Sequence, residues 1–186
     1  QLESNLCNIA NWFKANRLTL NVDRTKFMVF GTKHMLHKVD NTIIKYNNAV
    51  IERVDVFKYL GVKFDSNMSW LSHVDYLLQN ISKRIGVIRR VKHFLPHETL
   101  VMLSNALVIP HFDYACCVWS NFSQDCQSRL QVLHNRLART ILSADIMTPV
   151  NIMMDSLQWT KPDERWKNQL LVLTFKSLKY ITPSYL

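Results

Sequence analysis

The spacing of apolar residues changes near residue 68 and divides the chain into two parts. Before that point, short runs of alternating apolar and polar residues are typical of β-strands, over residues 26–30, 42–46, 49–54 and 56–65. A helix precedes them, because Leu2, Leu6, Ile9 and Phe13 recur at helical spacing. The first part is therefore predicted to combine one helix with a small sheet.

The predicted strands follow one another closely, so we expect a small antiparallel sheet. Asn47 and Asn48 between two of the runs are typical of a β-hairpin turn. Residues 32–41 are polar and are predicted to form a loop. The run from Val56 to Asp65 is predicted to be one strand, in which Gly61 indicates a bulge or the close approach of another backbone or a ligand.

From Ser69 onward the apolar residues recur every three or four positions. A long helix, with Ser69 as candidate cap and an end near Pro96, carries the stripe Trp70, Val74, Leu77, Ile81, Ile85 and Ile88. Further helices are predicted over residues 98–108, 111–119, 151–157 and 162–180. Another starts at Ser123 or Asp125 and has the stripe Leu130, Leu133, Leu137 and Ile141. The fold class is α+β, a small antiparallel sheet followed by a mostly helical bundle.

Composition and charge add a preference for partners. Of the 186 residues, 48% are hydrophobic and 20% are charged, which is typical of a folded globular chain. The formal net charge of +9 favours a polyanionic partner, and residues 76–97 contain no Asp or Glu. No apolar run approaches the roughly 18 residues of a membrane span, so no membrane partner is expected. Because the sequence begins with Gln1 in mid-pattern, we expect a fragment of a longer protein.

The cysteines and histidines predict no metal site. None of the four cysteines forms a C-x-x-C pair, and buried reduced thiols fit an intracellular protein, nuclear or cytoplasmic. Cys117, Cys126 and His134 have the wrong spacings for zinc. His34 and His37 have no further nearby ligand.

Several motifs together resemble the reverse transcriptases of non-LTR (LINE-type) retrotransposons. The family pattern W…N-x-L-x-L-N-x-x-K-T/S-x-M-x-F is matched by Trp12, residues 16–21 and residues 25–30, although here the order is Arg24-Thr25-Lys26. Residues 109–114 with Val118-Trp119 resemble the P-H-F-D-Y…V-W stretch of the family. The end of the chain resembles its W-x-x-x-x-x-R…Y-K-x-L…P-x-Y-L tail, from Trp159 to Leu186. The resemblance runs nearly end to end.

The resemblance implies three domains and two sites in the first of them. Residues 1–67 would be the C-terminal part of a polymerase palm, 68–143 a helical thumb and 144–186 a post-thumb helical segment. Lys26 would be the motif D lysine, a candidate general acid toward the leaving pyrophosphate; the alternative is a surface lysine at a strand start. The primer grip would be Lys58, Tyr59, Leu60, Gly61 and Val62, acting mostly through its backbone, with the side chains of Leu60 and Val62 packed in the core.

The resemblance also implies that the long helix of the thumb follows a template–primer duplex. Lys83, Arg84 and Arg90 lie off its apolar stripe and are candidate phosphate ligands, and Arg136 on a later helix is a further candidate. The alternative is a solvated helix face. For the P-H-F-D-Y stretch we favour structural roles, Asp113 at a helix dipole and Tyr114 in the core.

Nucleotidyl transfer by two metals needs a pair of carboxylates, and the sequence contains no Asp-Asp dipeptide. Asp55 and Asp65 flank one predicted strand and are expected at its opposite ends, too far apart to share a metal. We therefore expect no catalysis by this chain alone and no cofactor in it, whereas the parent polymerase would use Mg²⁺.

The expected partners are an RNA–DNA hybrid or other nucleic acid and the upstream palm and fingers of the parent. The alternative functions are a domesticated or decayed remnant that binds nucleic acid without sequence preference, or a structural helical domain.

Overall fold

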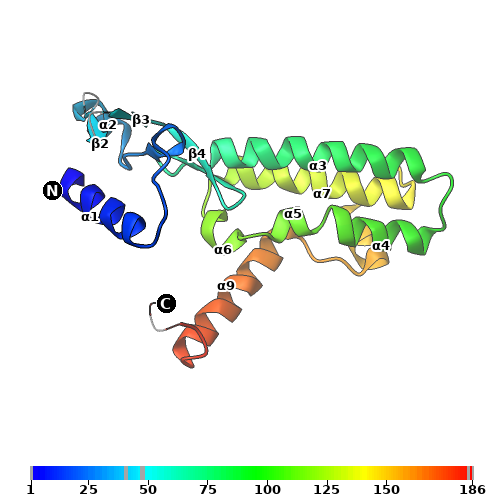
Figure 1. Ribbon diagram of the computed structural model, residues 1–186. Helices are drawn as coiled ribbons and strands as arrows, with labels where there is room; N and C mark the ends of the chain where they lie inside the picture. The colour runs from blue at the N-terminus through cyan, green and yellow to red at the C-terminus, as the bar shows by residue number, and fades with distance from the viewer. Residues whose placement is uncertain (1, 40–41, 47–48, 184, 186) are drawn as a thin grey trace. The chain divides into compact units, whose positions relative to one another are not determined.

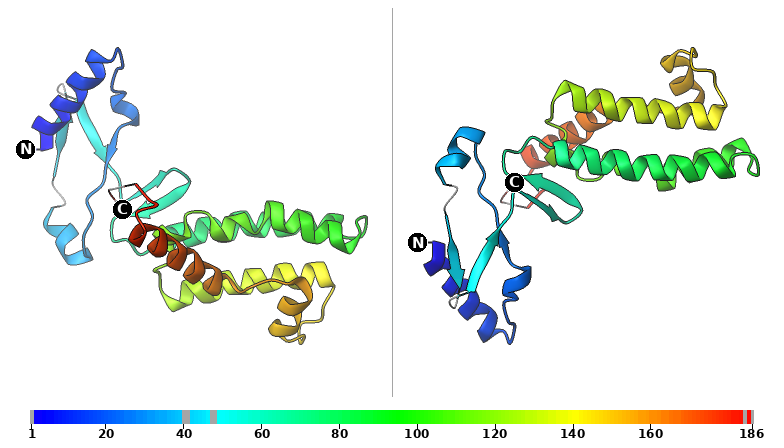
Figure 2. Two further views of the ribbon diagram at one scale, coloured as in Figure 1. Left: turned by 90° about the horizontal axis from the view of Figure 1, so that it is seen from below. Right: turned by 90° about the horizontal axis from the view of Figure 1, so that it is seen from above.

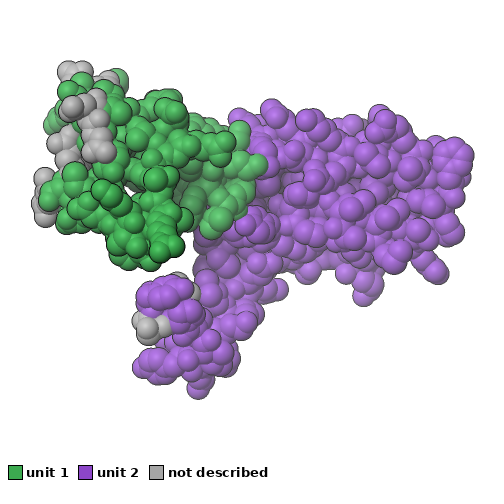
Figure 3. All heavy atoms as spheres, viewed as in Figure 1, with its two compact units in different colours: residues 1–72 green, residues 73–186 purple. Residues whose placement is uncertain are grey.

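The computed structural model describes residues 2–39, 42–46, 49–183 and 185. The chain forms two compact units, 1–72 and 73–186, each shown in its own colour in Figure 3. Together they form an α+β fold, because the strands found among the described residues lie in unit 1 and most of the long helical residues lie in unit 2. The predicted domain borders at 67/68 and 143/144 concern a parent enzyme and stay predictions.

Unit 1 contains two separate small sheets rather than one. Its elements are α1 (Leu2–Ala15), the 3-10 turn η1 (Val22–Arg24), β1 (Lys26–Phe27), α2 (Lys33–Lys38), β2 (Ile44–Tyr46), β3 (Ala49–Arg53), β4 (Val56–Tyr59) and β5 (Val62–Asp65). The first sheet has the order β1-β3-β2, and the second is the β4–β5 hairpin. Strand β1 pairs with β3 in parallel, so the prediction of an antiparallel sheet is wrong for this pair. The chain crosses over through α2 and β2 before β3, which permits parallel pairing.

Two further predictions for unit 1 need correction, and one is confirmed. Residues 33–38 form α2 instead of a loop, and the Thr32 hydroxyl caps it by accepting a hydrogen bond from the Met35 backbone N–H at 3.4 Å. Strand β1 is only two residues long, shorter than the predicted run over 26–30. Strands β2 and β3 pair antiparallel as predicted, whereas the turn at Asn47-Asn48 lies outside the described residues.

The predicted single strand over 56–65 is in fact a tight β-hairpin. Leu60 and Gly61 form its two-residue turn and both have positive φ, 45° and 87°, as in a type I′ turn. The hairpin returns the chain on itself, and the Ser66 backbone N–H donates to the Asp55 carbonyl at 2.9 Å. Asp55 and Asp65 therefore lie at the same end of the hairpin, contrary to the expectation that they lie far apart.

Unit 2 is built on two long parallel helices that lie side by side (Figures 1 and 2). They are α3 (Leu71–Val91), whose first two residues belong to unit 1, and α7 (Gln124–Leu142). Arg129 of α7 donates to Asp75 of α3 at 2.5 Å near their starts, and Lys92 Nζ lies 3.4 Å from Ser143 Oγ just beyond their ends. The chain runs between them through α4 (His97–Leu107), α5 (Pro110–Asp113) and α6 (Cys116–Trp119), and continues after α7 with α8 (Val150–Leu157) and α9 (Pro162–Leu178).

The core of unit 2 forms where the predicted apolar stripes meet the aromatic residues of the shorter helices. The stripe of α3 from Val74 to Ile88 and the stripe of α7 from Leu130 to Ile141 are buried, as predicted. Trp119 and Trp166 meet edge to face at 5.5 Å between ring centroids. Trp166 Nε1 donates to the Phe112 carbonyl at 2.7 Å, which fixes α9 against α5.

The segment after Pro110 departs from its prediction in several ways. The helix expected over 111–119 is interrupted between α5 and α6, because Ala115 adopts a left-handed conformation with φ 53°. Asp113, the last residue of α5, forms an ion pair with Arg165 of α9, and its predicted dipole role stays a prediction. Tyr114 is 57% exposed, so its predicted place in the core is wrong.

The long helix α3 ends at Val91, earlier than the predicted end near Pro96.

Within the described residues, the stretch His97–Trp119 is long and apolar enough to cross a membrane by length and composition, with a mean hydropathy of 1.3. The sequence pattern had indicated no such run. In the structure only 28% of its most apolar window is buried. The buried apolar side chains along the stretch are Leu100, Val108, Ile109, Phe112, Cys116 and Trp119.

Candidate nucleic-acid interface

Helix α3 presents a cationic face opposite its buried stripe. Lys83 and Arg90 are both exposed and lie seven residues apart, so they project from the same side of the helix. Gly86 lies between them, and a Cβ at this position would meet no atom within 4 Å. Residues 76–97 carry no carboxylate, and Asp75 near the start of the helix is paired with Arg129 of α7.

Arg84 is placed differently from Lys83 and Arg90. Its side chain is half-buried, and its guanidinium donates to the Asn80 carbonyl at 3.3 Å. Burial lowers the pKa of His111, and the nearby charge of Arg84 lowers it further, so Arg84 lies toward α5. The structure therefore separates Arg84 from the outward pair.

The arginines of α7 also differ in their surroundings. Arg129 is bound by Asp75, and this hydrogen bond raises the pKa of the guanidinium. Arg139 donates to the Ile146 carbonyl at 3.3 Å. Arg136 is exposed and follows Arg129 by seven residues, so it projects from the side of α7 on which Arg129 meets α3. In the described part of the chain Arg136 has no acidic partner.

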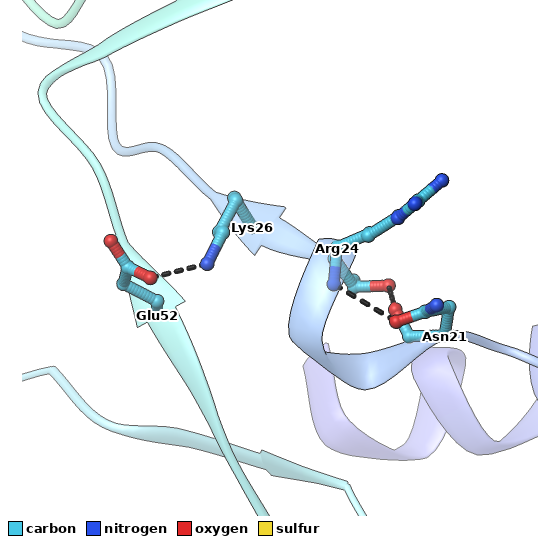
Figure 4. Close-up of polar contacts among 5 residues, drawn as sticks. Asn21, Arg24, Lys26 and Glu52 are labelled. Carbon is cyan, nitrogen blue, oxygen red and sulfur yellow. Dashed lines mark hydrogen bonds and ion pairs between the residues drawn. The ribbon is translucent and has the colours of Figure 1, made fainter.

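Lys26, the candidate general acid, has a partner within unit 1. Its ammonium forms an ion pair with Glu52, and the two residues face each other across the β1–β3 pair (Figure 4). The chain enters β1 through a turn that Asn21 holds, since its side chain accepts from the Arg24 backbone N–H at 3.1 Å. For proton donation to a ligand, Lys26 would first have to leave Glu52.

The residues of the predicted primer grip all belong to the β4–β5 hairpin. Leu60 at the turn is 72% exposed and Val62 is 4% exposed, so the core role predicted for both holds for Val62 and is wrong for Leu60. Lys58 faces Lys63 across the strands. Tyr59 is 59% exposed and lines an aromatic pocket that the sequence analysis missed. The alternation Phe57-Lys58-Tyr59 is the signal that indicates such a face.

Asp65 of unit 1 has a structural role in the folded chain. The buried Asp65 side chain accepts hydrogen bonds from the backbone N–H groups of Ser69 at 2.7 Å and Trp70 at 2.8 Å, which occupies both of its oxygens in a structural role. No group of three or more potential ligands occurs among the residues that the structure describes.

The candidate residues thus form two separate basic features, one on α3 and α7 within unit 2 and one on the β4–β5 hairpin within unit 1. A search against protein-family models, curated proteins and solved structures found no match to the chain. The resemblance to reverse transcriptases consequently stays a prediction from the sequence motifs.

Proposed function

We propose that the chain is the C-terminal part of a reverse transcriptase of a non-LTR retrotransposon and that it holds an RNA–DNA hybrid through its phosphates. The order of the sequence motifs supports the family. One structural observation carries the binding role: the exposed pair Lys83 and Arg90 on α3, in a stretch without carboxylates. In this proposal α3 belongs to the thumb and the hairpin to the primer grip.

The spacing of the cationic pair suits a polyanion. Seven residues of an α-helix span about 10.5 Å, and a nucleic-acid strand carries one phosphate about every 3.4 Å along a B-form axis. The two side chains can therefore reach phosphates a few nucleotides apart on one strand. Contacts of this kind give affinity without sequence preference, as a grip on a growing duplex requires.

The chain's own contribution in this proposal is binding and positioning, not chemistry. Because Asp65 is bound by backbone N–H groups, the carboxylate pair of the parent would come from residues upstream. Lys26 keeps its proposed role as a general acid of that parent, on the condition that a bound ligand displaces Glu52.

Binding to a hybrid with a recessed 3′ end, compared with blunt duplex and single strand over a salt series, tests this function. We expect tighter binding to the recessed end. Since each lost phosphate contact reduces the salt slope by about 1, the double variant Lys83→Gln/Arg90→Gln should lower it by about 2. The matched control Lys176→Gln/Lys179→Gln removes the same charge from the exposed end of α9 and should leave the slope nearly unchanged.

Other results would support the rival functions. Equal binding to all three nucleic acids would favour a remnant that binds without need of a primer end. An equal loss in both double variants would show that only net charge matters, and the absence of binding near physiological salt would contradict the proposal.

A further inference from the structure

The β4–β5 hairpin has an aromatic face and a basic face. Its register pairs Phe57 with Phe64 and Lys58 with Lys63. Successive residues of a strand point to opposite sides, whereas directly paired residues point to the same side. Phe57, Tyr59 and Phe64 therefore share one face of the hairpin, and the two lysines share the other.

The aromatic face forms one wall of a pocket of about 230 Å³ within unit 1. The opposite wall is the segment from Lys26 to Phe30, which follows η1. Five aromatic side chains line the pocket, Phe27, Phe30, Phe57, Tyr59 and Phe64, and Lys26 adds a charged one. A cavity of about 150 Å³ already admits benzene, so a planar ring fits here.

Backbone hydrogen bonds hold the two walls together. The Val54 backbone N–H donates to the Phe27 carbonyl at 3.0 Å, and the Gly31 backbone N–H donates to the Ser66 carbonyl at 3.0 Å. Phe64 also packs against the buried Trp70, with 5.4 Å between the ring centroids. The pocket is therefore preformed, and a ligand would not have to order it first.

The rings that line the pocket remain open to a ligand. Phe57 is 40% exposed and Tyr59 more so, which leaves flat apolar surface in contact with solvent. Lys58 and Lys63 project from the opposite face of the hairpin, so the cation that lines the pocket beside these rings is Lys26. Aromatic rings beside lysines are the combination that binds single-stranded nucleic acid, where bases stack and phosphates meet cations.

We propose that this pocket receives an unpaired base of the bound nucleic acid. The base would stack on Phe57 and Tyr59, and its sugar-phosphate would lie beside Lys26 and displace the ammonium from Glu52. Stacking of this kind is tolerant of sequence, since every base has a flat π-face. The inference rests on the proposed function and specifies the form of nucleic acid that unit 1 prefers, a duplex with an unpaired end.

The experiment separates stacking from overall binding by using two signals on one hybrid. 2-Aminopurine at an unpaired overhang position reports stacking through the loss of its fluorescence, and anisotropy of a dye at the far end reports binding. A second hybrid carries 2-aminopurine in the paired interior. We expect the chain to quench the overhang base and not the paired one.

The double variant Phe57→Leu/Tyr59→Leu should abolish the quenching and reduce affinity for the overhang hybrid about 5- to 150-fold, the range that stacking of one base contributes. The loss of affinity for blunt duplex should be smaller, because blunt duplex offers no unpaired base. Tyr59→Trp keeps an aromatic ring and should keep the quenching, and Tyr185→Leu removes an exposed ring outside the pocket as a matched control. Circular dichroism checks that each variant is folded.

The two signals distinguish failure of the inference from failure of the proposed function. Binding by anisotropy without quenching of the overhang base would overturn the pocket assignment alone, and would indicate that a protein segment or no ligand covers these rings. Equal quenching by the wild type and the folded double variant would also overturn it. Absence of any anisotropy change would overturn the proposed function, and with it the basis of the inference.

Discussion

At the scale of single residues, His134 of α7 is an ionisable group whose surroundings strongly favour one protonation state. Its side chain is fully buried and lies against Phe112 and Trp159, with ring centroids 5.5 and 5.3 Å away. Neither ring nitrogen has a hydrogen-bond partner among the described residues. Burial lowers the pKa of His134 to about 4, and the charge of Arg165 acts in the same direction. The folded chain therefore holds this imidazole neutral.

This lowered pKa predicts how stability depends on pH. In the unfolded chain His134 takes up a proton near pH 6.5, whereas in the folded chain it does so only near pH 4. The contribution of His134 to the free energy of unfolding is therefore fully present above about pH 6.5 and is lost as the pH falls toward 4. At pH 5 the loss should be roughly 2 kcal/mol. Urea unfolding of His134→Phe should show a smaller loss between pH 7.5 and 5, with His93→Gln as the exposed control. Equal losses in all three proteins would contradict this origin.

The ion pair of Asp113 and Arg165 shows how desolvation and charge attraction compare for a partly buried carboxylate. Burial raises the pKa of Asp113 more than the Arg165 guanidinium lowers it, although the two form an ion pair. Desolvation thus outweighs attraction for the carboxylate, as is common for buried pairs. The pair contributes to the registration of α5 against α9, while Trp166 and the surrounding rings supply the packing.

At the scale of elements, periodicity predicted the long helices well and the hairpin poorly. The buried stripes of α3 and α7 were predicted from apolar residues that recur every three or four positions, because a helix that buries one face has this spacing. The β4–β5 turn has no such signal. A type I′ turn favours Asn-Gly, and here Leu60 occupies the first position with φ 45°. Alternation continues through the turn, so the sequence resembles one strand.

The same limit applies to the candidate site. Lys83 and Arg90 were predictable as an outward pair, because helical spacing fixes their face. The aromatic pocket was not, since it requires residues 26–30 to meet a hairpin that local pattern does not reveal. The Lys26–Glu52 ion pair likewise depends on the parallel β1–β3 register, which sequence order alone disfavours.

Two glycine substitutions test the backbone of these elements. Gly86→Ala adds a methyl group in open space within α3 and should stabilise unit 2 by about 0.5–1 kcal/mol, because alanine loses less backbone entropy in a helix. Gly61→Ala should destabilise unit 1, since φ 87° strains an L-residue. Urea unfolding of both variants against wild type measures these changes. A destabilised Gly86→Ala would show that the α3 face is not open.

At the scale of the whole molecule, the two units bury very different amounts of apolar surface. In unit 1 the buried apolar residues of the described ranges are Ala10, Ile51, Val62 and Trp70, whereas unit 2 buries its long stripes and two tryptophans. Buried apolar area is the main source of stability. We therefore expect unit 2 to be the more stable of the two units. Unit 1, which contains the hairpin and its pocket, has the smaller core.

We therefore expect the units to open at different free energies. Hydrogen exchange followed by mass spectrometry in native buffer should show slow amides in α3 and α7 and faster exchange in β1 to β3, because fewer buried contacts hold the latter. A hybrid bound by both units should slow exchange in the β4–β5 hairpin as well as in α3, since a ligand stabilises what it binds. Protection of α3 alone would confine binding to unit 2. Equal exchange rates in both units without ligand would mean that unit 1 unfolds only together with unit 2. That result would contradict the inference that the smaller core of unit 1 opens at a lower free energy.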